Sequence, residues 1–266
     1  MKRIYRLLLL LFFLLIITAC GSNDHADKKK QAINRVEDAG VIRIGFEGTY
    51  QPFNFLNDDN EYAGFDVDVA NELASRLGVK TKFVATKWDS LIGGLKADKF
   101  DVIIAQMTVT EDRKKSVDFT DPYVVTGSVL VTANDTKGIS KLDDIKGKKV
   151  GVGGGTTFEE VARSVDGADV TLYKAVTDYI QDLVNGRLDV IINDQLLMSY
   201  NIKKEGLPLQ IASDILNKDE IAMAVKKGNE DFVAKLNKAL SDMMNDGTYD
   251  KIYKKWFDSE PLVKEK

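Results

Sequence analysis

The groups in this sequence that could do chemistry are carboxylates, cationic side chains, hydroxyls and aromatic rings. Cys20 is the only cysteine and His25 the only histidine in 266 residues, and His25 lies in a polar segment with three consecutive lysines. These counts exclude an intramolecular disulfide, a Cys/His metal site and a histidine-dependent catalytic triad. No calcium-binding EF-hand loop is present. We therefore expect no metal, no cofactor and no catalytic residue, although carboxylate chemistry remains open.

A polar segment from Gln106 to Arg113 follows an apolar run that is typical of a buried strand. The hydroxyl of Thr108 and the guanidinium of Arg113 can therefore lie at the edge of a sheet. A guanidinium offers a planar pair of donors that matches a carboxylate. The alternative interpretation is that Arg113 is a solvated surface residue.

A glycine turn, residues 153–155, joins a predicted strand to a predicted helix. Thr156 with Glu159, or Thr157 with Glu160, has the spacing of a capping box, and free amides at such a helix start can bind anions. The turn matches neither a P-loop nor a dinucleotide-binding fingerprint. The alternative is a tight connection with an ordinary cap and no ligand.

Two aromatic residues, Tyr50 and Trp88, each follow a predicted strand by a few residues and have polar neighbours. Aromatic side chains in such positions can form the walls of a ligand pocket. The alternative is that they belong to the hydrophobic core.

The elements that must position these residues alternate between strands and helices. Strands are predicted over 41–46, 81–85, 101–105, 128–132, 149–152, 170–173, 190–192 and 222–225. Helices are predicted over 65–77, 89–95, 158–165, 179–185, 195–204, 230–245 and 249–257. Folded structure should begin near Val36. This alternation predicts an α/β fold with mainly parallel strand pairing.

Residues 92–104 and 180–192 form an internal repeat of helix, short turn and buried strand. Unless the likeness is coincidence, it predicts two similar lobes. Gln106 and Asp194 lie at matching positions just beyond the repeated strands. Because ligands of α/β sheets bind outside the carboxyl ends of the strands, we expect these two side chains to face one cleft.

The first 19 residues have the features of a signal peptide. Lys2, Arg3 and Arg6 precede an apolar run that ends at Cys20 and is too short to span a bilayer. The ending Ile17-Thr18-Ala19-Cys20 resembles the lipobox of bacterial lipoproteins, in which the cysteine becomes the first mature residue and carries lipid such as palmitate. The alternative is an uncleaved anchor with an incidental cysteine.

The charge of the chain argues against nucleic acid as a partner. The formal charge is −4, and cleavage before Cys20 would remove three basic side chains and make it more negative. Nucleic-acid binding needs clustered lysine and arginine. After the first 19 residues, no apolar run approaches 18 residues, so we expect no further membrane span.

Taken together, these segments resemble the solute-binding proteins of polar amino-acid ABC importers, the bacterial extracellular solute-binding family 3. The likeness covers the chain from Val41 to Phe257. It rests on segments 42–53, 64–70, 147–152, 247–249 and 255–257, and its most specific part is 107–113 with 118–123.

The resemblance implies a two-lobed periplasmic-binding-protein type II fold with two crossover hinge strands. Residues 38–126 and 221–260 would form the first lobe and residues 127–220 the second. Residues 20–37 would be a flexible linker after the lipidated cysteine, and residues 261–266 a tail. The implied protein is a monomer, lipid-anchored on the extracytoplasmic face of the cell membrane, that delivers its ligand to permease and ATPase subunits.

The family also implies roles for site residues. Arg113 would bind the ligand α-carboxylate with Thr108, Thr156 and Thr157. Asp194 would accept the α-ammonium group, and Tyr50 and Trp88 would wall the side-chain pocket.

The ligand expected from the resemblance is L-cystine. Histidine and cationic amino-acid binders tend to have small hydroxyl residues where Ala105 and Gln106 stand, whereas the segments around Glu47, Trp88 and Gln106 are most similar to cystine-binding members. Glu47 could instead meet a cationic side chain, which leaves arginine, lysine or histidine as the alternative ligand.

Two other classes remain as rivals. A cleft lyase would need a proton donor and acceptor, and Glu47 and Asp194 are the only acids expected beside the ligand. A sensory module would lead into a membrane helix and a signalling domain, whereas the sequence stops at Lys266 after a polar tail.

Overall fold

The computed structural model describes residues 32–264. The expected signal peptide, the lipobox with Cys20 and the linker up to residue 31 lie outside the described residues. The helices are α2 (Ala32–Ala39), α3 (Phe65–Arg76), α4 (Leu91–Lys96), α5 (Glu111–Lys114), α6 (Thr157–Arg163), α7 (Val176–Val184), α8 (Gln195–Lys203), α9 (Glu230–Asn245) and α10 (Thr248–Trp256). Three short 3-10 helices accompany them: η1 (Trp88–Ser90), η2 (Leu142–Ile145) and η3 (Leu262–Lys264).

Most strands of the described chain belong to one mixed sheet in the order β5-β1-β6-β12-β7-β10-β8-β9, with β11 paired to β7. Its strands are β1 (Val41–Phe46), β5 (Lys80–Ala85), β6 (Val102–Ile103), β7 (Val117–Ala133), β8 (Lys149–Gly153), β9 (Asp169–Tyr173), β10 (Val190–Asp194), β11 (Leu209–Ile211) and β12 (Asn217–Lys226). A small antiparallel sheet contains β2 (Thr49–Tyr50), β3 (Asn54–Leu56) and β4 (Tyr62–Ala63).

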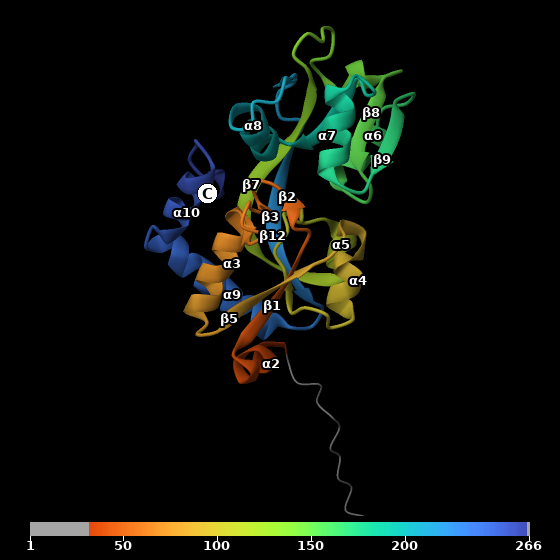
Figure 1. Ribbon diagram of the computed structural model, residues 1–266. Helices are drawn as coiled ribbons and strands as arrows, with labels where there is room; N and C mark the ends of the chain where they lie inside the picture. The colour runs from red at the N-terminus through yellow and green to blue at the C-terminus, as the bar shows by residue number, and fades with distance from the viewer. Residues whose placement is uncertain (1–31, 265–266) are drawn as a thin grey trace, which may run out of the picture. The chain divides into compact units, whose positions relative to one another are not determined.

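The long antiparallel pair β7 and β12 connects two parallel parts of this sheet. β1 pairs in parallel with β5 and β6, and β8 pairs in parallel with β9 and β10. β12 joins β6 on one side, and β7 joins β10 on the other. Figure 1 shows these two parts at opposite ends of β7, with α3 and α4 beside one and α6 and α7 beside the other.

Both connecting strands are longer than the sequence pattern predicted. The prediction covered residues 128–132 and 222–225, whereas β7 begins at Val117 and β12 at Asn217. Pro122 and acidic neighbours interrupt the apolar pattern of β7. The register between the two strands shifts beside Ala222, which lies opposite Pro122, and such an irregularity accommodates a residue without an amide donor.

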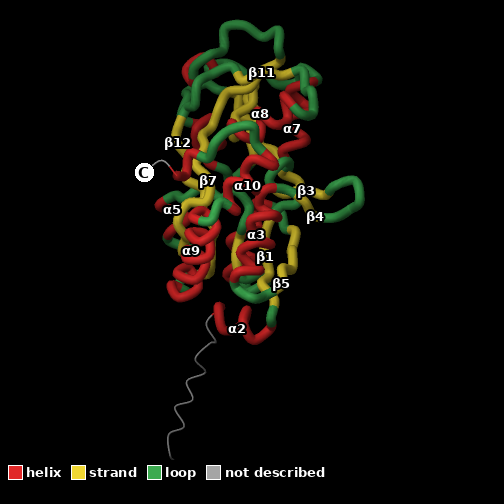
Figure 2. The backbone as a smooth tube through the Cα atoms, turned by 90° about the vertical axis from the view of Figure 1, so that its left-hand side faces the viewer, coloured by secondary structure: helices red, strands yellow, loops and turns green. Residues whose placement is uncertain are grey.

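Helix α2 makes the folded part begin earlier than the expected start near Val36. Its side chains Ala32, Ile33 and Val36 are buried in the main hydrophobic core, so this segment is not part of the flexible linker that was expected to reach residue 37. Figure 2 shows α2 at the end of the described chain near β1 and β5.

The repeat seen in the sequence is also a repeat of structure. Helix α4 leads into β6, and helix α7 leads into β10. β6 pairs in parallel with β1, and β10 pairs in parallel with β8. Gly45 of β1 and Gly151 of β8 occupy equivalent positions in the two halves. A Cβ at Gly45 would lie 2.4 Å from the ring of Phe100, and a Cβ at Gly151 would lie 2.4 Å from a methyl group of Leu188. In both halves, therefore, a large side chain packs directly on a glycine of the neighbouring strand.

The aspartate that opens each repeated strand also has the same backbone partner. Asp101 accepts the amide of Arg43 at 2.9 Å, and Asp189 accepts the amide of Lys149 at 2.8 Å. Asp101 differs because it is buried, with 3% exposure.

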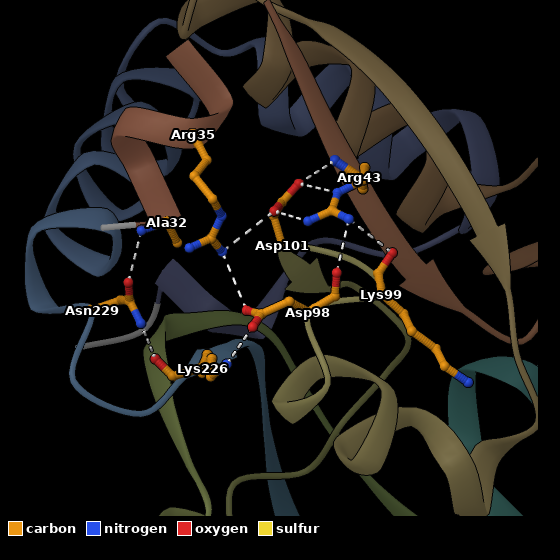
Figure 3. Close-up of polar contacts among 8 residues, drawn as sticks. All are labelled: Ala32, Arg35, Arg43, Asp98, Lys99, Asp101, Lys226 and Asn229. Carbon is orange, nitrogen blue, oxygen red and sulfur yellow. Dashed lines mark hydrogen bonds and ion pairs between the residues drawn. The ribbon is translucent and has the colours of Figure 1, made fainter. Parts of the chain in front are cut away.

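Figure 3 shows the polar cluster around Asp101. The guanidinium of Arg43 donates to both carboxylate oxygens of Asp101, at 2.6 and 3.0 Å. Arg35 of α2 lies 3.8 Å from Asp101 and 3.4 Å from Asp98, and Lys226 of β12 lies 2.6 Å from Asp98. The cluster thereby ties α2 to the ends of β1 and β12.

The repeat supplies a matched test of this cluster. Asp101→Asn keeps the side-chain size but removes the charge that Arg43 faces, so we expect the free energy of unfolding to fall by about 2–3 kcal/mol. Asp189→Asn alters the equivalent exposed position, and we expect a loss of about 0.5–1 kcal/mol. Urea unfolding of both variants measures the difference, and equal losses would contradict the role assigned to the buried cluster.

A candidate ligand-binding cavity

One cavity of about 390 Å³ lies between the two parallel parts of the sheet, where their strands end. The nine residues predicted to bind ligand all line it. They are Glu47, Tyr50, Trp88, Gln106, Thr108, Arg113, Thr156, Thr157 and Asp194. The sequence argument that strand ends converge therefore identified residues that the fold brings together.

Arg113 is held in place by carbonyl groups and an aromatic ring. Its Nη1 donates to the carbonyl oxygen of Thr108 at 2.8 Å, and its Nη2 donates to that of Gly155 at 3.3 Å. Its Cζ lies 5.1 Å from the ring centroid of Trp88, which is within the range of a cation–π contact. Burial lowers the pKa of Arg113, but a guanidinium stays charged in proteins. The cavity therefore contains a fixed positive charge.

Asp194 is a buried carboxylate with a structural task. It is the last residue of β10, rather than lying beyond the strand as predicted, and it caps α8 by accepting the amide of Leu197 at 2.9 Å. Its other oxygen accepts the hydroxyl of Thr126 at 2.7 Å. The residue is 5% exposed, and this burial raises the pKa of Asp194 to about 6.

Gln106 has a strained backbone, and only one end of its side-chain amide is hydrogen-bonded. Its φ is 56°, in the left-handed region that few residues other than glycine adopt. Its Nε2 donates to Asp66 at 2.7 Å and to the hydroxyl of Tyr123 at 3.2 Å. Its Oε1 is buried without a hydrogen-bond partner among the described residues, which is costly unless another donor reaches it.

Two aromatic residues join the sides of the cavity. The hydroxyl of Tyr50 donates to Oδ1 of Asn193 at 2.7 Å, and Nε1 of Trp88 donates to the carbonyl oxygen of Gly155 at 3.1 Å. Tyr50 and Trp88 follow strands of the first part of the sheet, whereas Asn193 and Gly155 belong to the second. The cavity is therefore closed by direct contacts between its two sides.

Thr156 caps α6 as predicted, but the capping box is incomplete, because Glu159 bonds the amide of Gly155 rather than that of Thr156. Thr156 accepts the amide of Glu159 at 3.3 Å and donates its hydroxyl to the carbonyl oxygen of Gly153 at 2.7 Å. The Glu159 carboxylate accepts the amide of Gly155 at 2.8 Å. Thr156 therefore uses its only hydroxyl proton within the turn.

Glu47 supplies a second carboxyl group to the cavity, besides that of Asp194. It is half-buried, and burial together with the neighbouring charge of Asp89 raises the pKa of Glu47 to about 7. Its carboxylate would ionise more readily beside a positive group.

Seven further charged or aromatic residues line the cavity but were not predicted: Lys87, Asp89, Phe158, Tyr173, Lys174, Tyr179 and Asp219. Lys174 directly follows β9, so the rule that identified Gln106 could have identified it. Asp219 lies within β12 and is 5% exposed; its burial raises its pKa, whereas the charge of Arg113 opposes that rise.

Comparison with known proteins places this fold and cavity in a family. Residues 42–259 match the family model of bacterial extracellular solute-binding proteins, family 3. The chain belongs to this family. It is 40% identical over 230 residues, 86% of each chain, to the L-cystine-binding protein TcyJ of Escherichia coli (strain K12). It is 33% identical over 264 residues to the L-cystine-binding protein TcyA of Bacillus subtilis (strain 168), covering 97% of this chain and 98% of that one.

Solved structures confirm the fold expected for this solute-binding family. An ancestral arginine-binding protein bound to arginine shares 40% identity and superposes with a TM-score of 0.78, covering 82% of this chain and 98% of that chain. The α/β architecture is thus the two-lobed type II fold of periplasmic binding proteins. Between residues 32 and 264, no helix is long and apolar enough to cross a membrane, and no cluster of residues has the composition of a metal site.

The capping role of Asp194 can be tested without ligand. Asn caps a helix as well as Asp does, whereas Ala removes the cap at a cost of about 0.5–2 kcal/mol. We therefore expect Asp194→Asn to unfold at nearly the wild-type urea concentration and Asp194→Ala to unfold earlier. Equal destabilisation of the two ligand-free variants would mean that capping is not the structural task of this side chain.

Proposed function

We propose that this protein is the extracytoplasmic amino-acid-binding subunit of an ABC importer and that its ligand is L-cystine. The observation that carries the proposal is the presence of Arg113 and Asp194 in one closed cavity. A fixed cation and a buried carboxylate together match the two charges of an amino-acid head group.

Within this proposal, Arg113 binds the α-carboxylate, with Thr108, Thr156 and Thr157 around it. Asp194 accepts the α-ammonium group. A ligand cation would lower the pKa of Asp194 from its raised value of about 6, so binding and ionisation favour each other. Gln106 offers its unpartnered Oε1 as a further acceptor, and Tyr50 and Trp88 cover the rest of the ligand.

Cystine is preferred because two relatives named as L-cystine-binding proteins match most of the chain. The alternative is a cationic amino acid, which a 40% identical arginine-binding structure favours. Glu47 could accept the side-chain cation of arginine or lysine, or the second ammonium group of cystine. Its own charge therefore does not separate the two ligands.

A cleft lyase is a weaker proposal on the same geometry. Asp194 already accepts hydrogen bonds from Thr126 and from the amide of Leu197, and the proposed ligand ammonium group would take its remaining lone pairs. Asp194 would then have no lone pair left to act as a general base.

The proposed lobes are residues 38–126 with 221–260, and residues 127–220. The contacts of Tyr50 with Asn193 and of Trp88 with Gly155 would then be contacts between lobes. Strands β7 and β12 would be the hinge strands. Ligand would favour the closed arrangement through its bonds to both lobes.

A thermal-shift screen of the twenty amino acids and L-cystine, followed by calorimetry, tests the ligand. We expect Arg113→Ala to weaken cystine binding by about 2–5 kcal/mol, because the α-carboxylate loses its buried partner. Arg163→Ala, which removes an arginine from the outer surface of α6, is the matched control and should bind as wild type does. Binding by Arg113→Ala within about threefold of wild type would reject the assigned role.

We also propose that a lipid on Cys20 holds the protein at the membrane. Cys20→Ser should release the protein from the membrane fraction or leave an unprocessed precursor, because the lipid-bearing thiol is lost. Cell fractionation and the mass of the mature protein measure both effects, with His25→Ala as the control outside the lipobox. Normal maturation and membrane retention of Cys20→Ser would refute the proposal.

A further inference from the structure

Two lysines at the cavity have no partner that explains them. Lys87 directly precedes η1, and Lys174 directly follows β9. Both line the cavity and are otherwise exposed. Within residues 32–264, neither ammonium group has an ion pair or a hydrogen bond to another side chain. Two positive charges are therefore available to a ligand.

The two lysines both line the cavity, and each is next in sequence to a residue that contacts the same glycine turn. Trp88, the neighbour of Lys87, donates to the carbonyl oxygen of Gly155 at 3.1 Å. Tyr173, the neighbour of Lys174, accepts the amide of Gly154 at 3.0 Å. Both lysines thus adjoin the turn that contains Gly154 and Gly155.

The charges that line the cavity form two mixed sets. The first contains Arg113, Asp194 and Asp219, and the positive charge of Arg113 acts on Asp219. The second set is made up of the other charged lining residues, the cations Lys87 and Lys174 and the acids Glu47 and Asp89, of which Asp89 acts on Glu47. Each set has both signs, so each matches a zwitterion rather than a single charge.

Arginine and lysine fit this pattern poorly. Each has one zwitterionic head and one positive end, and the positive end would meet two lysines along with the acids of the second set. Like charges brought together disfavour the wrong ligand. A ligand with a second carboxylate would satisfy the lysines instead.

We propose that Lys87 and Lys174 bind the carboxylate of the second head group of a disulfide-linked bis-amino acid, and thereby select it over cationic amino acids. This inference rests on the proposed function, in which Arg113 and Asp194 bind the first head group.

The test uses ligands that differ only in the second head group. L-cystine has both charges there, the mixed disulfide of cysteine and cysteamine has the ammonium group alone, and the mixed disulfide of cysteine and 3-mercaptopropionate has the carboxylate alone. Calorimetry compares wild type, the double variant Lys87→Ala/Lys174→Ala, and the control Lys82→Ala, which removes an exposed lysine of β5 outside the cavity.

We expect the double variant to bind L-cystine and the carboxylate-only disulfide about 3- to 30-fold more weakly, the range for two partly exposed ion pairs. Its affinity for the cysteamine disulfide should stay within about twofold of wild type, and its affinity for arginine should not fall. Thermal unfolding without ligand verifies that the variant is folded.

The other outcomes separate the two proposals. If wild type fails to bind L-cystine, the proposed ligand is wrong and the inference falls with it. If wild type binds L-cystine but the double variant matches Lys82→Ala, or weakens for all three disulfides alike, the lysines do not read the second carboxylate. The cystine-binding function would then stand without them.

Discussion

The site depends on one electrostatic constraint: buried charged groups line one cavity, where water solvates them less than at the surface. Asp194 and Asp219 are each 5% exposed, and Arg113 faces the same space. Burying a charge is costly unless hydrogen bonds and an opposite charge compensate it. Thr126 and the start of α8 compensate Asp194, and the carbonyl oxygen of Thr108 compensates Arg113. These hydrogen-bond partners are neutral, and the zwitterion that we propose as ligand would add opposite charges to them.

The sheet explains why these charges meet. Strands β7 and β12 join two parallel sets of strands so that the carboxyl ends of both sets open on one cavity. The shared packing of Gly45 on Phe100 and of Gly151 on Leu188 fixes the central strands of each set in the same way. Gln106 and Asp194 consequently reach the cavity from equivalent places in the two halves. The repeat in the sequence therefore predicts where the site lies in the fold.

Local patterns predicted the parts of this structure that depend on local physics. The apolar periodicity of residues 65–77 predicted α3, and residues just beyond strand ends predicted the cavity. The first eleven residues of β7 were missed because Asp118, Asp121 and Pro122 disrupt their pattern, and pairing with β12 overrides that preference. Asp219 was missed for the same reason, since its burial depends on a partner strand distant in sequence. Helix α2 was missed because contacts such as that of Ala32 with Asn229, 197 residues away, stabilise it.

Gln106 lines the cavity and bonds the buried carboxylate of Asp66 behind it. Its amide nitrogen lies on Asp66, which is 1% exposed and also accepts hydrogen bonds from Asn54 and Tyr123. Burial raises the pKa of Asp66 to about 7, and these three donors offset part of that effect. A small hydroxyl residue at position 106 could not reach across in this way, and the acid would then be open to the cavity and to a ligand cation. With glutamine in place, Asp66 is satisfied from within the protein. In the complex that we propose, the negative charge near the far end of the ligand would come from Glu47 and Asp89, and Lys87 and Lys174 would balance it.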